Sequence, residues 1–390
     1  MDLARKLWLR GLDLLPTAGF YFDRPLVLLQ SDDWGRAGLR DHEGLERLRG
    51  AGISLGERPY DFYSLETAED LAALREVLKH HRDSAGRHPC LAMNFIVANL
   101  DLAKNPATTG KLTFMPLAEG LPQGWNRPNL VDGYRSGIAD GVFHAALHGT
   151  SHFCSASVER SMTGDGERAA LLRTLWEAGT PYIHWRMPWI GYEYWDPEQP
   201  EDDRFLPREL QRDLIGQTIG AFAKLFAALP SSACAPGYRA NDDTHRIWSQ
   251  HGIRVVQNGP GTLIPPFFDR HKILHLARTV EFEPALDRAF SVEKCVQQAE
   301  ACFTRGVPAI VSMHSINFHS TVCDFRSPSL RALDEFFTAL KLKYPNLLYL
   351  HDEDLRQLVN HGRYERGSGQ VQVNVRRKSF IKAVVAARKA

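Results

Sequence analysis

The 390-residue sequence lacks the features that mark several classes of protein. No run approaches the ~18 consecutive apolar residues that a membrane-spanning helix needs. The formal net charge is only +1, with 47 Lys and Arg against 46 Asp and Glu, which argues against a general nucleic-acid binder. Internal repeats, low-complexity tracts and an interdomain linker are missing as well. The sequence therefore predicts a protein that contains no membrane span and does not bind nucleic acid.

Cysteine is scarce too. The six cysteines form neither a C-x-x-C pair nor a dense disulfide framework, so we expect reduced thiols, as in the cytoplasm. Charged residues interrupt the apolar positions of the first 16 residues, which predicts an amphipathic helix rather than the continuous apolar segment of a secretory signal. We therefore expect a cytoplasmic protein with an amphipathic helix over residues 1–20.

Apolar residues make up 44% of the chain and charged residues 24%, so a sizeable core can form. Strands and helices are expected in alternation, which predicts a parallel sheet closed or nearly closed into an α/β barrel. The expected strands are 24–31, 90–98, 141–148, 181–186, 232–237, 252–257, 272–279, 307–314 and 346–351. The expected helices are 65–82, 166–178, 208–228, 243–250, 291–305 and 328–343. Residues 99–140 and 185–207 are expected to be largely loops.

The pair Asp32–Asp33 ends the first of these apolar runs, just before Gly35. Two adjacent carboxylates at the end of a buried strand repel each other and lose hydration, which costs free energy unless a cation or a hydrogen-bond partner offsets it. A divalent metal on one carboxylate would leave the other free to act as a base. The alternative is that the pair caps a helix.

A second apolar run, 141–148, ends in His148, and His152 follows four residues later. On one helical turn this spacing places both imidazoles on the same face, where they can share one ion. One Asp and two His make an open three-ligand site, which suits metal-dependent hydrolysis. Zn²⁺, Co²⁺, Mn²⁺ and Ni²⁺ all accept such ligands. The alternative is a pair of ordinary polar histidines.

These two motifs resemble the first and second motifs of the polysaccharide deacetylases (carbohydrate esterase family 4, the NodB-homology domain). The resemblance implies that Asp32 is the catalytic base and that Asp33, His148 and His152 bind the metal, with Zn²⁺ expected first. It also implies a distorted, seven-stranded (β/α) barrel with long loop insertions. We place that barrel at residues 21–362.

Two further segments are similar to later motifs of the family. Pro236-Gly237-Tyr238-Arg239 resembles the third motif, which implies that Arg239 orients the base and that a backbone N–H near Tyr238 binds the oxyanion. A tight turn with a surface arginine is the alternative. His314 ends the strand 307–314 and resembles the fifth motif, in which a histidine acts as general acid. The alternative for His314 is a hydrogen-bonded structural residue.

Residues beside these motifs are candidates for binding the substrate. Trp34 follows the Asp pair, and Asn317 and His319 follow the predicted acid. Trp185 opens the aromatic-rich segment 185–207, whose rings could stack on sugar faces or form a hydrophobic lid or a subunit contact. The family pattern is incomplete, because Gly149 replaces the usual Ser or Thr and the Asp-x-x-Asp-Trp motif is missing.

The sequence therefore predicts a metal-dependent enzyme that removes the N-acyl group of an amino sugar in a polysaccharide, glycolipid or sugar precursor. A glycoside hydrolase, which needs two carboxylates flanking the glycosidic bond, and a non-catalytic carbohydrate-binding protein remain open. Residues 363–390 form a basic tail, with seven Lys or Arg and no acid from Arg366 onward. This tail is expected either to contact an anionic membrane surface or to form a solvated helix or disordered segment.

Overall fold

The computed structural model describes residues 18–104, 110–180, 187–260, 263–366 and 369–379. A ten-stranded sheet forms its centre, in the order β11–β12–β2–β3–β6–β7–β8–β10–β9, and β13 also pairs with β2. All neighbours are parallel except β9 and β10. The strands are β2 (Leu26–Trp34), β3 (Leu91–Ile96), β6 (Phe143–Gly149), β7 (Ser232–Ala233), β8 (Val255–Asn258), β9 (Phe267–Phe268), β10 (Leu274–Ala277), β11 (Val280–Glu281), β12 (Ala309–His314) and β13 (Leu348–Leu350).

The predicted α/β fold with a curled parallel sheet is confirmed. The sheet has ten strands rather than seven, however. In the described part of the chain its two end strands, β11 and β9, do not pair with each other, so the sheet is a curled half-barrel rather than a closed one. Short strands such as β9 and β11 are weak sequence signals, which explains why the pattern of apolar runs missed them.

Both faces of this sheet are buried. All nine residues of β2 are buried, as expected for a parallel strand covered on both sides. Leu26 and Leu28 pack with α12 (Asp352–His361) on the concave face. Val27 and Leu29 belong to the larger cluster formed with the outer helices. Alternate residues of one strand thus meet two separate cores.

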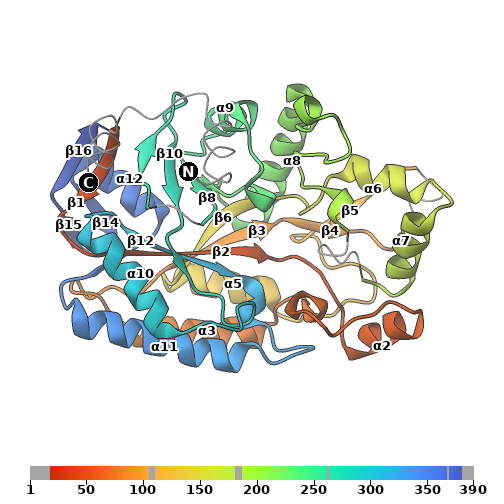
Figure 1. Ribbon diagram of the computed structural model, residues 1–390, viewed down its shortest axis with the longest axis horizontal. Coiled ribbons are helices and arrows are strands. Elements are labelled where there is room, and N and C mark those ends of the chain that lie inside the picture. The colour runs from red at the N-terminus through yellow and green to blue at the C-terminus, as the bar shows by residue number, and fades with distance from the viewer. Residues whose placement is uncertain (1–17, 105–109, 181–186, 261–262, 367–368, 380–390) are drawn as a thin grey trace.

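Helices cover the convex face. Figure 1 shows α3 and α11 along the lower side of the sheet, and α8 and α9 along its upper side. The outer helices are α3 (Ala68–His80), α5 (Leu130–Ala139), α8 (Arg208–Phe226), α9 (Asp242–Gln250), α10 (Val292–Thr304) and α11 (Arg326–Lys343). Of these helices, α3, α8 and α10 lie inside their predicted ranges, α9 begins one residue early and α11 begins two residues early. The agreement reflects the regular apolar spacing of these segments. The helix α5 was not predicted.

Shorter elements gather beyond the carboxyl ends of the strands. The helices α2 (His42–Gly50), α6 (Ser155–Met162) and α7 (Glu167–Glu177) share a separate apolar cluster there. Residues 99–140, predicted as loops, also contain α5 and the antiparallel pair of β4 (Ala98–Leu100) and β5 (Phe114–Pro116). The segment 187–207 contains short 3₁₀ turns at Pro188–Ile190 and Glu201–Asp203 and isolated antiparallel bridges at Trp195.

The two ends of the described chain pair with each other. β1 (Ala18–Phe22) runs antiparallel to β16 (Val375–Ser379), and β14 (Arg363–Arg366) pairs with β15 (Gly369–Gln372). Residues 18–20, 363–366, 369–372 and 375–379 therefore lie in strands, where a terminal helix and a basic tail were predicted. Burial of Phe20 and Phe22 against the concave-face core favours the extended form.

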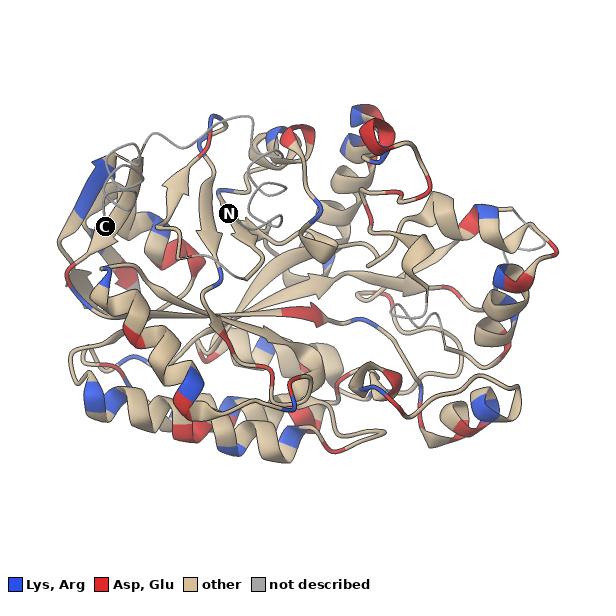
Figure 2. Cartoon of the chain, viewed as in Figure 1, with Lys and Arg blue, Asp and Glu red and all other residues tan. Residues whose placement is uncertain are grey.

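The remaining terminal residues, 1–17 and 380–390, lie outside the described residues. Arg376, Arg377 and Lys378 are exposed on β16, which is the basic strand at the left of Figure 2. Contact between this strand and an anionic surface stays a prediction. Among the helices that the structure describes, none combines the length and apolar character needed to cross a membrane.

Candidate metal centre

Asp32 and Asp33 end β2, but they do not point apart as neighbours on a regular strand do. The pairing of β2 with β3 shifts register between Ser31 and Trp34, and Asp33 adopts a left-handed backbone with φ 72°. Such a conformation is strained for a residue other than glycine. As a result both carboxylates line the same cavity, of about 290 Å³.

The histidine pair is brought together by a turn rather than by a helix, which corrects the sequence-based geometry. His148 is the last residue but one of β6, and Gly149 then turns the chain at φ 153°, so that His152 returns to the cavity. A Cβ atom at Gly149 would collide with the buried carboxylate of Glu193. This collision explains why glycine replaces Ser or Thr at that position.

Asp33, His148 and His152 converge as predicted. Asp33 Oδ1 lies 3.3 Å from His152 Nε2 and 3.7 Å from His148 Nε2. Zn²⁺ bonds of about 2.0–2.1 Å in a tetrahedron place neighbouring ligand atoms roughly 3.3 Å apart. Asp33 Oδ1 and His148 Nε2 are also buried without a hydrogen-bond partner among the described residues. Buried polar atoms of this kind fit a divalent cation.

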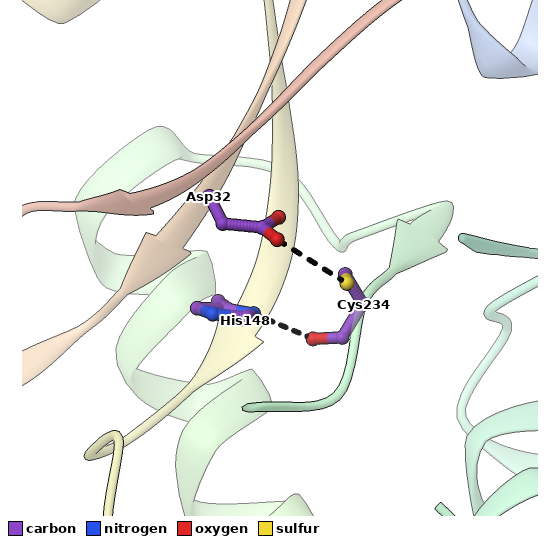
Figure 3. A group of neighbouring side chains, drawn as sticks. All are labelled: Asp32, His148 and Cys234. Carbon is purple, nitrogen blue, oxygen red and sulfur yellow. Dashed lines mark hydrogen bonds between the residues drawn. The ribbon is translucent and has the colours of Figure 1, made fainter. Parts of the chain in front are cut away.

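The orientation of His148 supports the same conclusion. Its Nδ1 lies 2.8 Å from the carbonyl oxygen of Cys234, which can only accept, so Nδ1 carries the proton. Figure 3 shows this contact together with the one between the Cys234 thiol and Asp32. The lone pair of Nε2 therefore faces the cluster, in the way that outer partners orient metal-binding histidines.

Asp33 is ionised in this environment. Burial alone would raise its pKa, but the Arg36 guanidinium, 2.9 Å from Asp33 Oδ2, and the ring of His152 hold the pKa well below its usual range. Arg36 thus fixes one carboxylate oxygen. The other oxygen, Oδ1, remains directed at the two histidines.

Asp32 is held by a second arginine. Arg278 Nη2 donates to Oδ1 at 2.6 Å and Nη1 donates to Oδ2 at 2.7 Å, while Asn94 Nδ2 donates to Oδ1 at 2.7 Å. Burial of Asp32 raises its pKa, but Arg278 and His148 outweigh this effect and hold the pKa far below its usual range. Asp32 is therefore a fixed, ionised carboxylate.

Arg278, rather than the predicted Arg239, orients Asp32. Arg239 lies beyond the turn Pro236–Tyr238 and places its guanidinium over the ring of Trp195, 4.7 Å from the centroid. Arg278 directly follows β10 and is fully buried. The predicted strand 272–279 contained this arginine at its carboxyl end, so the signal was present in the sequence.

His314 faces Asp32 from the end of β12. Its Nε2 lies 4.0 Å from Asp32 Oδ2, and its Nδ1 lies 2.7 Å from Glu283 Oε1. Burial lowers the pKa of His314, but the carboxylates of Glu283, Asp32 and Asp33 outweigh it and raise the pKa to about 9. No motif pointed to Glu283, which lies in an irregular segment after β11.

Three residues predicted to bind substrate have other roles. Trp34 is fully buried and stacks on Phe318, with ring centroids 5.9 Å apart. Asn317 is buried and donates from Nδ2 to Glu283 Oε2 at 2.7 Å, so it supports the partner of His314. His319 is also buried, and its Nε2 lies 3.4 Å from Glu66 Oε2. All three positions are closed to a ligand.

Of the other two residues predicted to contact substrate, Tyr238 lines the cavity and Trp185 is not among the described residues. Tyr238 donates from its hydroxyl to Asp32 Oδ2 at 3.3 Å. The backbone N–H groups of Tyr238 and Arg239 donate to Ala235 and Pro236 within their own turn, so neither serves as the predicted oxyanion donor. Trp185 lies outside the described residues. Tyr60 and Tyr192 line the cavity instead.

A buried polar network supports the base from beneath. Asn94 Nδ2 also donates to Gln257 Oε1 at 2.6 Å, and Gln257 Nε2 donates to Asp352 Oδ2 at 2.7 Å. Gln30 Nε2 donates to the other oxygen of Asp352 at 2.8 Å. Arg278 donates to the amide oxygens of Gln30 and Gln257, so both of these amides are held at both ends. The position of Asp32 is thus supported by residues from β2, β3, β8 and α12.

Comparisons with known proteins give a similar architecture only. No family model matches the chain, and no curated protein matches its sequence. A protein designated a polysaccharide deacetylase from Mycobacterium smegmatis aligns at 12% identity and a TM-score of 0.47, over 89% of this chain and 95% of its own. A further one from Pseudomonas aeruginosa PAO1 aligns at 13% identity and a TM-score of 0.46, over 87% and 92%.

A family 4 carbohydrate esterase from Streptomyces lividans, solved with acetate, aligns at 13% identity and a TM-score of 0.35, over 83% of this chain and 90% of its own. Identities of 12–13% with TM-scores under 0.5 do not assign an activity, however, so the function has to be argued from the site.

Proposed function

We propose that this chain is a divalent-metal-dependent hydrolase that removes the N-acyl group, acetyl first, from an amino sugar. One observation carries the proposal. Asp33, His148 and His152 converge, with Asp33 Oδ1 and His148 Nε2 buried and without a hydrogen-bond partner among the described residues. They lie beside two further groups, Asp32 and His314, whose pKa values are shifted in opposite directions. Pairs of this kind separate the roles of base and acid.

A divalent ion bound by the three ligands would lower the pKa of its water and polarise the acyl carbonyl. Asp32 accepts the proton of the attacking water, because it is ionised and reaches into the cavity. Its bidentate bond with Arg278 and its bond with Asn94 fix the direction of the carboxylate. Tyr238 closes the same side of the cavity.

His314 supplies the proton for the departing amine. With a pKa of about 9 it is protonated at neutral pH, and Glu283 holds Nδ1 so that Nε2 faces the cavity. An amine anion is a very poor leaving group, so proton transfer to the nitrogen has to accompany breakage of the C–N bond. Hydrolysis of an amide therefore makes use of both the acid and the base.

The cavity suits one sugar ring. Its volume of about 290 Å³ lies at the small end of ligand pockets. Tyr60, Tyr192 and Tyr238 provide aromatic surface on its wall, which can contact the apolar C–H face of a pyranose. We therefore propose an amino sugar bound as a single residue, either free or at the end of a larger molecule.

The alternative functions fit the same residues less well. A glycoside hydrolase needs a protonated carboxylic acid beside the bond that breaks, whereas Asp32 and Asp33 are both held ionised. A non-catalytic sugar-binding protein would have no use for the pair of His314 and Glu283 opposite a base. The arrangement of both groups around the ligands favours an enzyme.

Release of free amine from N-acetylated sugars tests the proposal. We expect release by the metal-loaded protein, loss of release with a chelator, and recovery when Zn²⁺ or Co²⁺ is added back. His148→Ala should abolish release and the binding of the pocket ion, while the control His80→Ala, at an exposed position, should leave both unchanged. Release that a chelator does not reduce would contradict the proposal.

A further inference from the structure

A second cluster of two histidines and one aspartate lies outside the pocket. His245 comes from α9, Asp269 follows β9, and His275 lies within β10. One ligand atom from each of these residues lies within 4.8 Å of the other two. None of the three lines the cavity, and the reaction proposed above does not use them.

The distances in this cluster match those in the pocket. Asp269 Oδ2 lies 3.2 Å from His275 Nε2 and 3.9 Å from His245 Nδ1. The corresponding distances from Asp33 are 3.3 and 3.7 Å. Both sets lie near the separation of roughly 3.3 Å that two ligands of a tetrahedral Zn²⁺ ion require.

The surroundings hold the ligands in place. Asp269 Oδ1 accepts the backbone N–H groups of His271 at 2.8 Å and Ile273 at 2.9 Å, which leaves Oδ2 directed at the two imidazoles. Phe267 stacks on the ring of His275, with centroids 4.9 Å apart and an interplanar angle of 8°. Outer contacts of this kind orient metal ligands.

We propose that His245, Asp269 and His275 bind a structural divalent cation, Zn²⁺ first, which ties α9 to the β9–β10 hairpin. All three side chains are at most 8% exposed and none lines the cavity, so an ion here would hold the elements together rather than meet a substrate. A water molecule would complete the coordination.

The position of this site gives it a further consequence. His275 lies on the face of β10 opposite Leu274 and Leu276, which belong to the concave core. Arg278, three residues after His275, lies on the concave side and holds Asp32. A cation bound to His275 on one face of β10 would therefore fix the strand whose other face leads to Arg278, the residue that holds Asp32.

Zinc content tests the proposal without any measurement of activity. The full chain and the variant His148→Ala/His152→Ala, which lacks the pocket site, are loaded with excess Zn²⁺, gel-filtered and analysed by mass spectrometry. We expect two equivalents in the wild type and one in the variant. Adding His275→Gln or Asp269→Asn to the variant should remove the last equivalent, whereas His271→Gln should not.

Tetrahedral Co²⁺ gives a second readout, because its visible absorption should persist in the variant that lacks the pocket site. If that variant binds no metal while its circular dichroism equals that of the wild type, the cluster is only a hydrogen-bonded His–Asp pair, and the proposal is overturned. This result does not depend on the pocket, so failure of the second site and failure of the proposed deacetylase are distinguishable. If the added substitutions prevent folding, the number of zinc equivalents bound by the His148→Ala/His152→Ala variant still tests the second site.

Discussion

The two His–Asp clusters of this molecule contain the same ligand types in different surroundings. Asp33, His148 and His152 face a cavity that also contains an ionised carboxylate and a protonated imidazole. Asp269 and His275 are enclosed by backbone N–H groups and a phenylalanine ring. The comparison indicates that the His and Asp ligands determine whether an ion can bind. Neighbouring acidic and basic groups, such as Asp32 and His314, determine whether the bound ion can take part in catalysis.

The largest effect should come from the base. Asp32→Asn keeps the shape of the side chain and removes its ability to accept a proton, so turnover should fall by about 10²–10⁴-fold while zinc content stays unchanged. Amine release and metal analysis of the same sample measure both quantities. The exposed substitution Asp287→Asn is the control. Near-native turnover in Asp32→Asn would contradict the role of Asp32 as base, and with it the proposed difference between the two clusters.

A smaller loss is expected when the base is misdirected. Arg278→Lys keeps the positive charge but removes the bidentate contact with Asp32, so turnover should fall about 100-fold, as misplaced catalytic groups do. Arg239→Lys is the matched control, because Arg239 stacks on Trp195, and it should change turnover little. The comparison of turnover in the two variants tests which arginine orients the base. A larger loss in Arg239→Lys would reverse the assignment.

Glu283→Gln should move the pH profile rather than abolish activity. Glu283 is the main group that raises the pKa of His314, so its neutral replacement should lower that pKa from about 9. The alkaline limb of the rate profile should then shift to lower pH, and NMR titration of the metal-free protein should report the same direction. An unchanged limb would remove His314 from the role of acid.

The same shift has a defined effect on stability. Because the pKa of His314 is raised in the fold, the pair with Glu283 stabilises the protein fully below the unfolded value of about 6.5. This contribution is lost as the pH rises through about 9. Unfolding by urea at several pH values should show the loss in the wild type and a weaker one in Glu283→Gln.

The smallest expected effect concerns how the pocket ligands are positioned. Gly149→Ser introduces a Cβ against the Glu193 carboxylate at φ 153°, so it should destabilise the protein by about 1–3 kcal/mol. Glu193→Ala should recover part of that loss in the double variant, since the two residues are in contact. Urea unfolding measures both values. Additive effects would show that Glu193 does not set the turn between the two histidines.

Much of the fold could be predicted from the sequence, because long apolar runs and regular helical spacing are strong local signals. The runs ending at Asp32, His148 and His314 marked three strands and the residues at their ends. The short strands β9 and β11 and the paired strand β16 escaped, since two to five residues carry little periodicity and β16 is stabilised by its distant partner β1.

The site was predicted less completely. The convergence of Asp33, His148 and His152 could be predicted from residue type and position. The register shift that brings Asp32 and Asp33 side by side does not show in the sequence. Arg278 was within reach, because a strand ending in arginine was expected at 272–279. Trp34 was misassigned because adjacency in the chain does not reveal which way a side chain points.

The pairing of β1 with β16 joins the first described strand to the last one. A chain cut after Gly362 would lose β16, the strand that pairs with β1 among the described residues, while Phe20 and Phe22 would stay packed in the concave-face core. In the shortened protein, the edge of β1 that pairs with β16 would be exposed and could pair with strands of other molecules. We therefore expect that removing the residues after Gly362 makes the protein prone to aggregation.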